Sequence, residues 1–347
     1  SAAAALHSCP GHRFFRPTTC FLMISHRRLP AVVCCAAMLT LSLHAEDRPW
    51  NVRDHVKLED VVVQSHRGAG VLAEEGTLEA FELGWKLGTY PEADLRATSD
   101  GVIVTFHDNT FARVVKDASP ELKKKGVQDV TYAELAQMDV GAWKGEAFRG
   151  RRVLPMATVF EIMRADRRKK IYMDVKKVEF KPLAEEVRRQ DVARQLVLAS
   201  PNPDQLREWK ALVPEGETLL WMHGNEAKLT QELTALRETQ FAGVTQVQIH
   251  VYPKNTTQGW APPADATPPG DPFRLRSAFL RETGDVLRAH GVLFQVFPWT
   301  DDPKVIPVLL DLGIMSFATD HPDAVMREIR AYYEEKRPTR GGANFPR

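Results

Sequence analysis

The sequence predicts an α/β protein, and the architecture that suits it best is a (β/α)8 TIM barrel with a small inserted subdomain after the third strand. Beyond residue 50, short runs rich in β-branched residues alternate with amphipathic stretches of helical length. This alternation is typical of parallel strands that are connected by helices. The 347 residues, 44% of them apolar, suit one large barrel or two ordinary domains, and they exclude a disordered chain or a small disulfide-stapled protein.

Nine segments are predicted to be strands, and they compete for the eight places of a closed barrel. Each is a short apolar run bounded by polar or turn-forming residues. In chain order they are residues 61–65, 92–97, 102–106, 170–175, 196–199, 218–222, 244–251, 293–298 and 315–318.

Nine segments are predicted to be helices, and most of them follow a predicted strand. Ala278, Phe279, Val286 and Leu287 recur at helical spacing, so their segment is expected to pack one face inward. In chain order the predicted helices are residues 77–87, 132–138, 157–164, 181–190, 204–212, 226–239, 276–290, 304–312 and 322–335.

Two segments interrupt this alternation. Residues 109–153 are far longer than the usual loop of about 2–6 residues, which predicts a small inserted subdomain. Residues 253–272 contain six prolines, which favours an extended surface loop or a lid. Residues 336–347 have the composition of a disordered tail.

Charge and cysteine content narrow the function. The 46 basic residues nearly balance the 45 acidic ones, so the chain has no general attraction for nucleic acid or for an anionic membrane surface. Any phosphate chemistry must therefore come from local groups. All four cysteines precede residue 36, which excludes disulfides, cysteine metal sites and a thiol nucleophile from the rest of the chain.

Residues 23–45 resemble a secretory signal. Arg27 and Arg28 precede an apolar run over residues 29–43, and acidic residues begin at Glu46. The run is shorter than the roughly 20 residues that span a bilayer, although a membrane anchor is the alternative. We expect a secreted or periplasmic protein of residues 46–335 without a stable anchor, and we interpret residues 1–22, before Met23, as upstream sequence.

Carboxylates on two predicted strands suggest a cation site. Glu92 and Asp94 are two positions apart in a strand, so both side chains point to the same side. Because like charges held close together resist joint ionisation, a divalent cation with oxygen ligands explains the pair. Asp174 and Lys176 also share one face. The alternatives are solvated carboxylates on an edge strand and an ordinary salt bridge.

Two histidines follow other predicted strands. His66 and Arg67 come directly after the first strand, and His107 comes after the third. The carboxyl ends of barrel strands meet at one mouth, so these groups are expected to share a cavity with the carboxylates. Carboxylates that hold a hard cation, basic groups that hold phosphate oxygens and imidazoles that move protons make a phosphoryl site. A structural role for either histidine is the alternative.

The order of these motifs resembles the glycerophosphodiester phosphodiesterase family over residues 61–325. The inserted segment is also similar, through its Leu-x-x-Met-Asp-x-Gly-x-Trp run at residues 135–143. The motifs that carry the resemblance are His66-Arg67-Gly68, Glu75 before Ala80-Phe81, Glu92-Ala93-Asp94, Asp100-Gly101, His107-Asp108, Asp174-Val175-Lys176, Trp299-Thr300 and Thr319-Asp320-His321-Pro322.

The resemblance implies metal-dependent hydrolysis of glycerophosphodiesters to sn-glycerol 3-phosphate and an alcohol. The implied cofactor is Ca²⁺ or Mg²⁺. The implied roles are metal binding by Glu92, Asp94 and Asp174, phosphate binding by Arg67 and Lys176, acid and base catalysis by His66 and His107, and an apolar wall for glycerol from Trp299.

The chain also departs from the family. Asp174 stands where the family has a glutamate, so a cation would lie nearer that strand or be bridged by water. Gln246, Gln248 and His250 lie on one face of a strand that we cannot match to the family. Two alternatives to the implied activity are a lysophospholipase D or sphingomyelinase D type phosphodiesterase and a non-catalytic phosphodiester-binding barrel. The sequence leaves the oligomeric state open.

Overall fold

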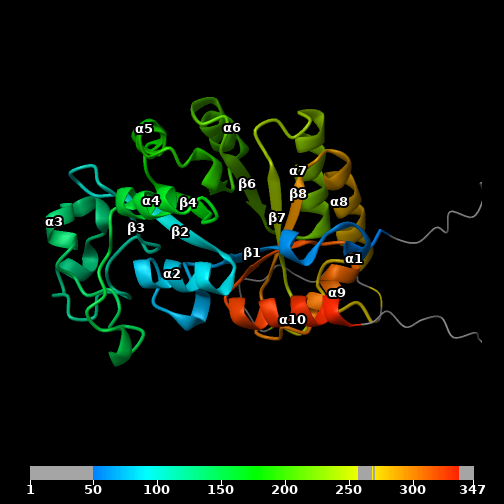
Figure 1. Ribbon diagram of the computed structural model, residues 1–347, viewed down its shortest axis with the longest axis horizontal. Helices are drawn as coiled ribbons and strands as arrows, with labels where there is room; N and C mark the ends of the chain where they lie inside the picture. The colour runs from blue at the N-terminus through cyan, green and yellow to red at the C-terminus, as the bar shows by residue number, and fades with distance from the viewer. Residues whose placement is uncertain (1–49, 257–267, 269, 336–347) are drawn as a thin grey trace, which may run out of the picture. The chain divides into compact units, whose positions relative to one another are not determined.

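The computed structural model describes residues 50–256, 268 and 270–335, and its central feature is a closed barrel of eight parallel strands (Figure 1). Each strand pairs with two neighbours, and β1 closes the ring by pairing with both β9 and β2. The predicted fold is therefore confirmed. The barrel strands are β1 Val62–Ser65, β2 Tyr90–Ala97, β4 Ile171–Lys177, β5 Leu196–Ser200, β6 Glu217–Met222, β7 Gln246–Val251, β8 Leu293–Pro298 and β9 Ser316–Thr319.

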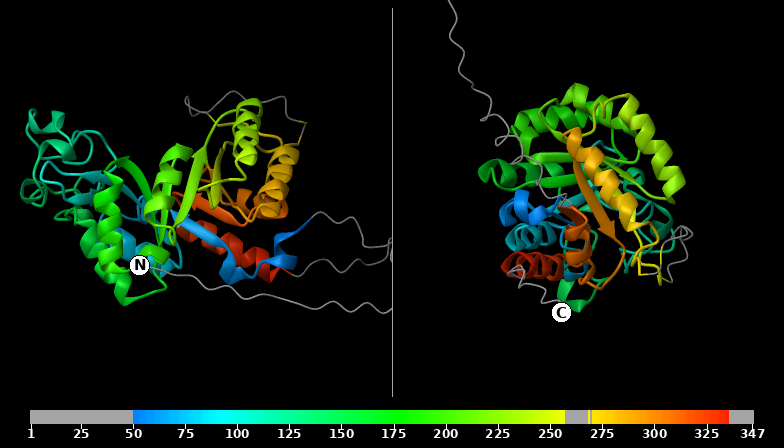
Figure 2. Two further views of the ribbon diagram at one scale, coloured as in Figure 1. Left: turned by 90° about the horizontal axis from the view of Figure 1, so that it is seen from above. Right: turned by 90° about the vertical axis from the view of Figure 1, so that its right-hand side faces the viewer.

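Helices surround the strands, as the right-hand view of Figure 2 shows. Most bounds agree with the predicted ones to within two residues, but α1 was not predicted and α3 ends three residues sooner. None of the described helices is long and apolar enough to cross a bilayer. The helices are α1 Val52–His55, α2 Leu78–Leu87, α3 Tyr132–Leu135, α4 Met156–Ala165, α5 Phe180–Gln190, α6 Pro203–Leu212, α7 Glu226–Glu238, α8 Ser277–Ala289, α9 Val305–Asp311 and α10 Pro322–Glu334.

The third predicted strand is not a barrel strand. It forms β3 Ile103–Thr105, which pairs antiparallel with β2. The cause is the length of β2, which pairs with β1 only at Tyr90 and Pro91 and then runs on past the end of β1. The chain reverses at Gly101, whose φ of +82° favours glycine. β3 therefore leads back along β2, and it returns His107 to the mouth of the barrel.

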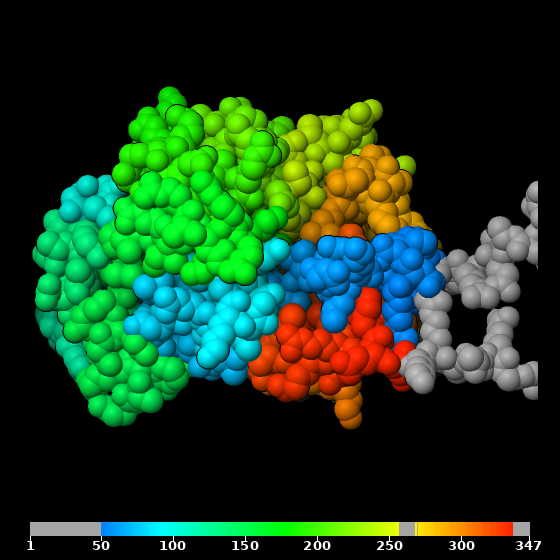
Figure 3. Space-filling view, in the orientation of Figure 1, coloured from blue at the N-terminus to red at the C-terminus, as the bar shows by residue number. Residues whose placement is uncertain are grey.

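Residues 109–153 follow β3 and contain α3. In the space-filling view of Figure 3 they lie on the left-hand side, in teal to green. Thr131 caps this helix, since its hydroxyl accepts a bond from the Glu134 amide at 3.3 Å while the Glu134 carboxylate accepts one from the Thr131 amide at 2.8 Å. Apolar side chains of this segment pack with β3 in a cluster of their own that includes Phe106, Phe111 and Leu135. These contacts fix the position of the segment beside β2 and β3.

Several expectations concern residues outside the described part of the chain. The proposed signal at residues 23–45, the upstream residues 1–22 and the tail 336–347 are among them. The same holds for residues 257–267 and 269 of the proline-rich loop. These interpretations stay predictions.

The inside of the barrel is unexpectedly polar. Tyr172 of β4 is fully buried, and its hydroxyl donates to the Gln246 side-chain oxygen at 2.8 Å. The Gln246 amide in turn donates to Glu217 at 2.7 Å. A hydroxyl is therefore needed at the centre of the barrel to satisfy buried amide groups.

Replacing Tyr172 with Phe is expected to lower the free energy of unfolding by about 1–3 kcal/mol, because the Gln246 oxygen would stay buried without its donor. Urea unfolding at pH 7 measures the change. Tyr132→Phe is the matched control, since the Tyr132 hydroxyl makes a longer, partly exposed bond of 3.4 Å to the Val153 carbonyl. Equal losses in the two variants would contradict the role of the buried hydroxyl.

Candidate active site

A cavity of about 170 Å³ opens at the carboxyl end of the barrel strands. Seven of the eight predicted site residues line it, and the eighth, Asp94, lies directly beside them. The structure thus brings all eight together. The seven lining residues are His66, Arg67, Glu92, His107, Asp174, Lys176 and Trp299.

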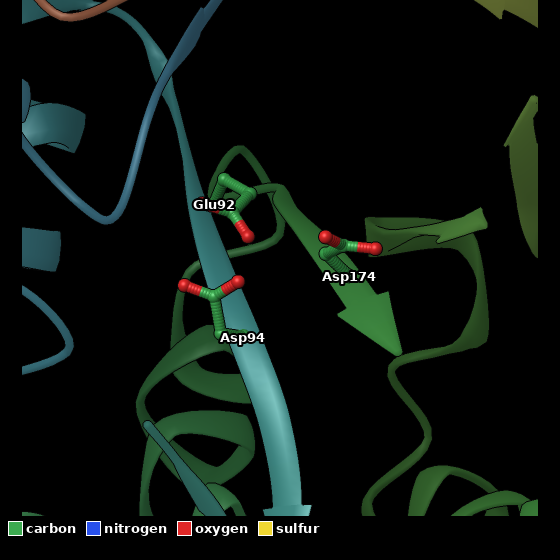
Figure 4. A group of neighbouring side chains, drawn as sticks. All are labelled: Glu92, Asp94 and Asp174. Atoms are coloured by element: carbon green, nitrogen blue, oxygen red, sulfur yellow. The ribbon is translucent and has the colours of Figure 1, made fainter. Parts of the chain in front are cut away.

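Glu92, Asp94 and Asp174 converge from two neighbouring strands (Figure 4). Asp94 of β2 pairs in register with Asp174 of β4, and one oxygen from each of the three carboxylates lies within 4.8 Å of the others. Glu92 and Asp94 are only 2% and 4% exposed. Three closely spaced carboxylates, two of them buried and the third partly buried, fit a hard divalent cation.

Electrostatics in this cluster support the same conclusion. Burial, together with the charges of Asp94 and Asp174, raises the pKa of Glu92 well above its usual value. Burial acts on Asp94 in the same direction, but nearby positive groups, Lys176 foremost, lower the pKa of Asp94 overall. The Lys176 ammonium lies 2.6 Å from Asp174 and 3.1 Å from Asp94. One ammonium shared among three carboxylates leaves negative charge that a bound cation would balance.

Arg67 occupies a left-handed backbone conformation, with φ of +52°. This turn points the Arg67 amide at Glu92, whose carboxylate accepts its hydrogen at 2.7 Å. The guanidinium donates to Glu75 at 3.1 Å. Glu75 thus orients the Arg67 fork at the cavity wall, where a phosphate oxygen could bind it.

His66 is oriented by a carboxylate from the last strand. Its Nδ1 lies 2.7 Å from Asp320, which directly follows β9. A backbone hydrogen bond holds the two segments next to each other, because the His66 amide donates to the Thr319 carbonyl at 3.0 Å. Burial opposes ionisation of Asp320, but bonding to His66 lowers the pKa of Asp320 overall. With Nδ1 engaged, Nε2 is the atom of His66 that can exchange a proton in the cavity.

His107 has a similar partner from within its own loop. Its Nδ1 lies 2.8 Å from Asp108, which also accepts bonds from Arg113 at 2.7 and 2.8 Å. Arg113 then bonds Glu75 at 2.5 and 3.0 Å. Burial opposes ionisation of Asp108, but these bonds lower the pKa of Asp108 to about 2. Arg113 thereby ties the inserted segment to the loop that orients Arg67.

The opposite side of the cavity is aromatic. The rings of Phe297 and Trp299 stack at 4.1 Å, and the His250 ring meets Trp299 edge-on at 5.5 Å. Trp221 stacks parallel to His250 at 5.6 Å. The cavity therefore has a charged half from β1, β2 and β4 and an aromatic half from β6, β7 and β8.

Four residues that orient the site were not among the predicted site residues. Glu75, Asp108 and Asp320 lie in the motifs that carry the family resemblance, and those motifs were the signal that could have identified them. Only Asp108 is adjacent to a predicted site residue, His107. Arg113 had no such signal, because its role depends on how the inserted segment folds back over the mouth.

A larger cavity of about 410 Å³ lies over β6 between α6 and α7. It shares only Trp221 with the smaller one and contains none of the predicted site residues. Size therefore does not identify the reactive cavity here, whereas the convergence of titratable groups does.

Comparison with known proteins identifies relatives of this chain. The glycerophosphoryl diester phosphodiesterase family matches residues 66–324. A glycerophosphodiester phosphodiesterase of Caldanaerobacter subterraneus subsp. tengcongensis is 28% identical over 278 residues, which are 78% of this chain and 98% of that protein. The Bacillus subtilis protein YhdW is 35% identical over 98 residues, and that match spans 28% of this chain and 38% of YhdW.

Solved structures share the fold. An Oleispira antarctica phosphodiesterase, solved in complex with the product sn-glycerol-3-phosphate, superposes with a TM-score of 0.53 at 21% identity. The superposition covers 79% of this chain and 97% of that one. The barrel is thus common to both chains.

Proposed function

The chain belongs to the glycerophosphoryl diester phosphodiesterase family, and on that basis we propose that it hydrolyses glycerophosphodiesters to sn-glycerol 3-phosphate and an alcohol with the help of a divalent cation. The observation that carries this proposal is one cavity that joins two histidine–aspartate pairs to three carboxylates, an arginine and a lysine. A phosphodiester needs this combination of charge stabilisation and proton transfer.

Glu92, Asp94 and Asp174 would hold the cation, Ca²⁺ or Mg²⁺. Their spacing within 4.8 Å, their burial and their oxygen chemistry support this role. When bound, the cation would neutralise the phosphate and stabilise the charge that builds up during the reaction.

Arg67 and Lys176 bind the non-bridging phosphate oxygens in this mechanism. The guanidinium offers a planar fork that matches two oxygens, while the ammonium acts as a point charge. Lys176 comes from β4 and Arg67 from the end of β1, so they reach the cavity from different strands.

His66 and His107 transfer the protons. One imidazole takes a proton at Nε2 from the attacking hydroxyl of water or of the glycerol unit, whose oxygen forms the new bond to phosphorus. Attack by the glycerol hydroxyl would give a cyclic phosphate, which water would then open to sn-glycerol 3-phosphate. The other imidazole donates a proton from Nε2 to the alkoxide that leaves when the phosphorus–oxygen bond breaks. Asp320 and Asp108 hold the two rings by their Nδ1 atoms. Trp299 provides an apolar wall for the carbon backbone of glycerol.

The test of this function is an assay over glycerophosphodiesters with different alcohols, with Ca²⁺, Mg²⁺ or a chelator. We expect release of sn-glycerol 3-phosphate that stops on chelation. Lysophosphatidylcholine and sphingomyelin serve as the comparison, because faster turnover of these lipids would favour the lysophospholipase D or sphingomyelinase D alternative. No turnover of any ester in the presence of metal would support the non-catalytic alternative.

Asp320→Asn is expected to lower kcat by about 10²-fold or more, because an amide can donate to Nδ1 and then stabilises the wrong tautomer of His66. Asp301→Asn is the matched control, since Asp301 bonds His321 but is 95% exposed and is expected to change kcat less than about twofold. Equal rates for the Asp320 variant and the wild type would show that His66 needs no carboxylate partner.

A further inference from the structure

A continuous chain of hydrogen bonds runs through the barrel from the active-site cavity to the opposite end. It starts at His250, whose Nε2 lies 3.2 Å from the Gln248 oxygen. The Gln248 amide donates to Gln295, and Gln295 donates to the Tyr172 hydroxyl at 3.3 Å. The Tyr172 hydroxyl bonds Gln246, which bonds Glu217 as described above. The chain thus ends on a carboxylate.

The carboxylate fixes the direction of every bond. Glu217 is paired with Lys170 at 3.1 Å, and an ionised carboxylate can only accept. Gln246 must then turn its amide nitrogen to Glu217 and its oxygen to Tyr172, so the Tyr172 hydroxyl donates. Because the Tyr172 hydroxyl uses its hydrogen for Gln246, Gln295 must donate from its amide nitrogen to that hydroxyl. The Gln295 oxygen then accepts from the amide nitrogen of Gln248, and the Gln248 oxygen faces His250.

His250 must therefore carry its proton on Nε2, because that atom faces an acceptor. Burial, helped by the charges of His223 and His66, lowers the pKa of His250 to about 3, so the ring is neutral near pH 7. Nδ1 is then left with a lone pair. No hydrogen bond among the described residues involves Nδ1, and the side chain lines the active-site cavity.

We propose that Nδ1 of His250 accepts a hydrogen bond from a free hydroxyl of the substrate's glycerol unit and so selects substrates that carry that hydroxyl. This inference rests on the proposed function. It assigns a binding role to a strand face that carries none of the motifs of the family resemblance.

The chemistry of a glycerophosphodiester supports the glycerol unit as the donor. Its phosphate oxygens only accept hydrogen bonds, so an unprotonated Nδ1 would repel them. In glycerophosphocholine, the two free glycerol hydroxyls are the only hydrogen-bond donors. The position of His250 agrees, because its ring lies edge-on to Trp299 at 5.5 Å. Trp299 can cover the carbon backbone of glycerol while His250 reaches a hydroxyl.

The test compares kcat/KM for glycerophosphocholine with kcat/KM for two analogues, one lacking the terminal and one lacking the middle glycerol hydroxyl. Wild-type enzyme is expected to prefer glycerophosphocholine over at least one analogue by tenfold or more, since a buried acceptor left unpaired is costly. His250→Phe keeps an aromatic ring beside Trp221 but has no acceptor, and we expect it to reduce that ratio at least tenfold.

Two further variants distinguish the effect of losing the hydrogen-bond acceptor from the effect of losing the aromatic ring. His250→Asn places an amide oxygen near the position of Nδ1, so it is expected to keep part of the preference. The longer side chain of His250→Gln places its amide near the position of Nε2 instead, so this variant is expected to lose the preference for the hydroxyl. Equal ratios in wild-type enzyme and His250→Phe would overturn the inference. If wild-type enzyme hydrolyses none of the esters, the proposed function itself fails.

Nuclear magnetic resonance provides a test that does not depend on turnover. In protein labelled with ¹⁵N-histidine, the signals missing from the His250→Phe spectrum identify His250. We expect a neutral ring with its proton on Nε2 at pH 7. A proton on Nδ1 would overturn the inference, because Nδ1 could not then accept a bond from substrate.

Discussion

Glu92→Gln and Asp94→Asn are each expected to reduce metal-dependent hydrolysis at least about 10³-fold. Each substitution removes a charged oxygen ligand from a buried cluster whose three carboxylates lie within 4.8 Å. An amide keeps the shape of the side chain, so the loss reflects charge and ligand chemistry rather than packing. The assay is product release at saturating Ca²⁺ and Mg²⁺, with Glu146→Gln, on an exposed surface carboxylate, as the control.

The same two variants are expected to differ in stability when a chelator is present. Glu92 ionises against burial and against two like charges, so Glu92→Gln is expected to raise the free energy of unfolding at pH 7. Asp94 is stabilised by Lys176 at 3.1 Å, so Asp94→Asn is expected to lower it. Calcium should stabilise the wild type but neither variant. Near wild-type activity in either variant would refute the cation site.

The barrel could be predicted because its strands and helices differ clearly in the spacing of their apolar residues and in their length. The apolar run at residues 293–298, for example, matches β8 at both ends. The sequence could not show which of the nine predicted strands lies outside the barrel, because a short apolar run looks the same in a parallel and an antiparallel strand. What decides the direction of β3 is the length of β2 beyond β1, which is a tertiary property.

The predicted site residues were those with reactive side chains that lie on predicted strands or directly follow them. Glu92 and Asp94 show this best, since their spacing of two on one strand also gives their common direction. The partners that orient the site were harder to predict. Asp320 reaches His66 across 254 positions, and Arg113 depends on the path of the inserted segment. The role of Glu217 could not be predicted, because it acts on His250 through a chain of four buried side chains.

His66→Ala and His107→Ala are each expected to lower kcat by about 10²- to 10⁴-fold, the usual contribution of a positioned proton-transfer group. Both imidazoles line one cavity, and both are held at Nδ1 by a carboxylate. Because they act in one reaction, the double variant is expected to lose much less than the product of the two single losses. His290→Ala, on an exposed histidine that bonds the Val286 carbonyl, is the control.

The leaving group distinguishes the acid from the base. A p-nitrophenyl phosphodiester releases a phenolate that needs little protonation, so removing the general acid should matter far less on this ester than on glycerophosphocholine. Removing the base should matter equally on both. One of the two single variants is therefore expected to regain activity selectively on the activated ester, and that variant identifies the acid. If both variants are equally impaired on both esters, neither histidine protonates the leaving group, and the pair would instead bind the phosphate.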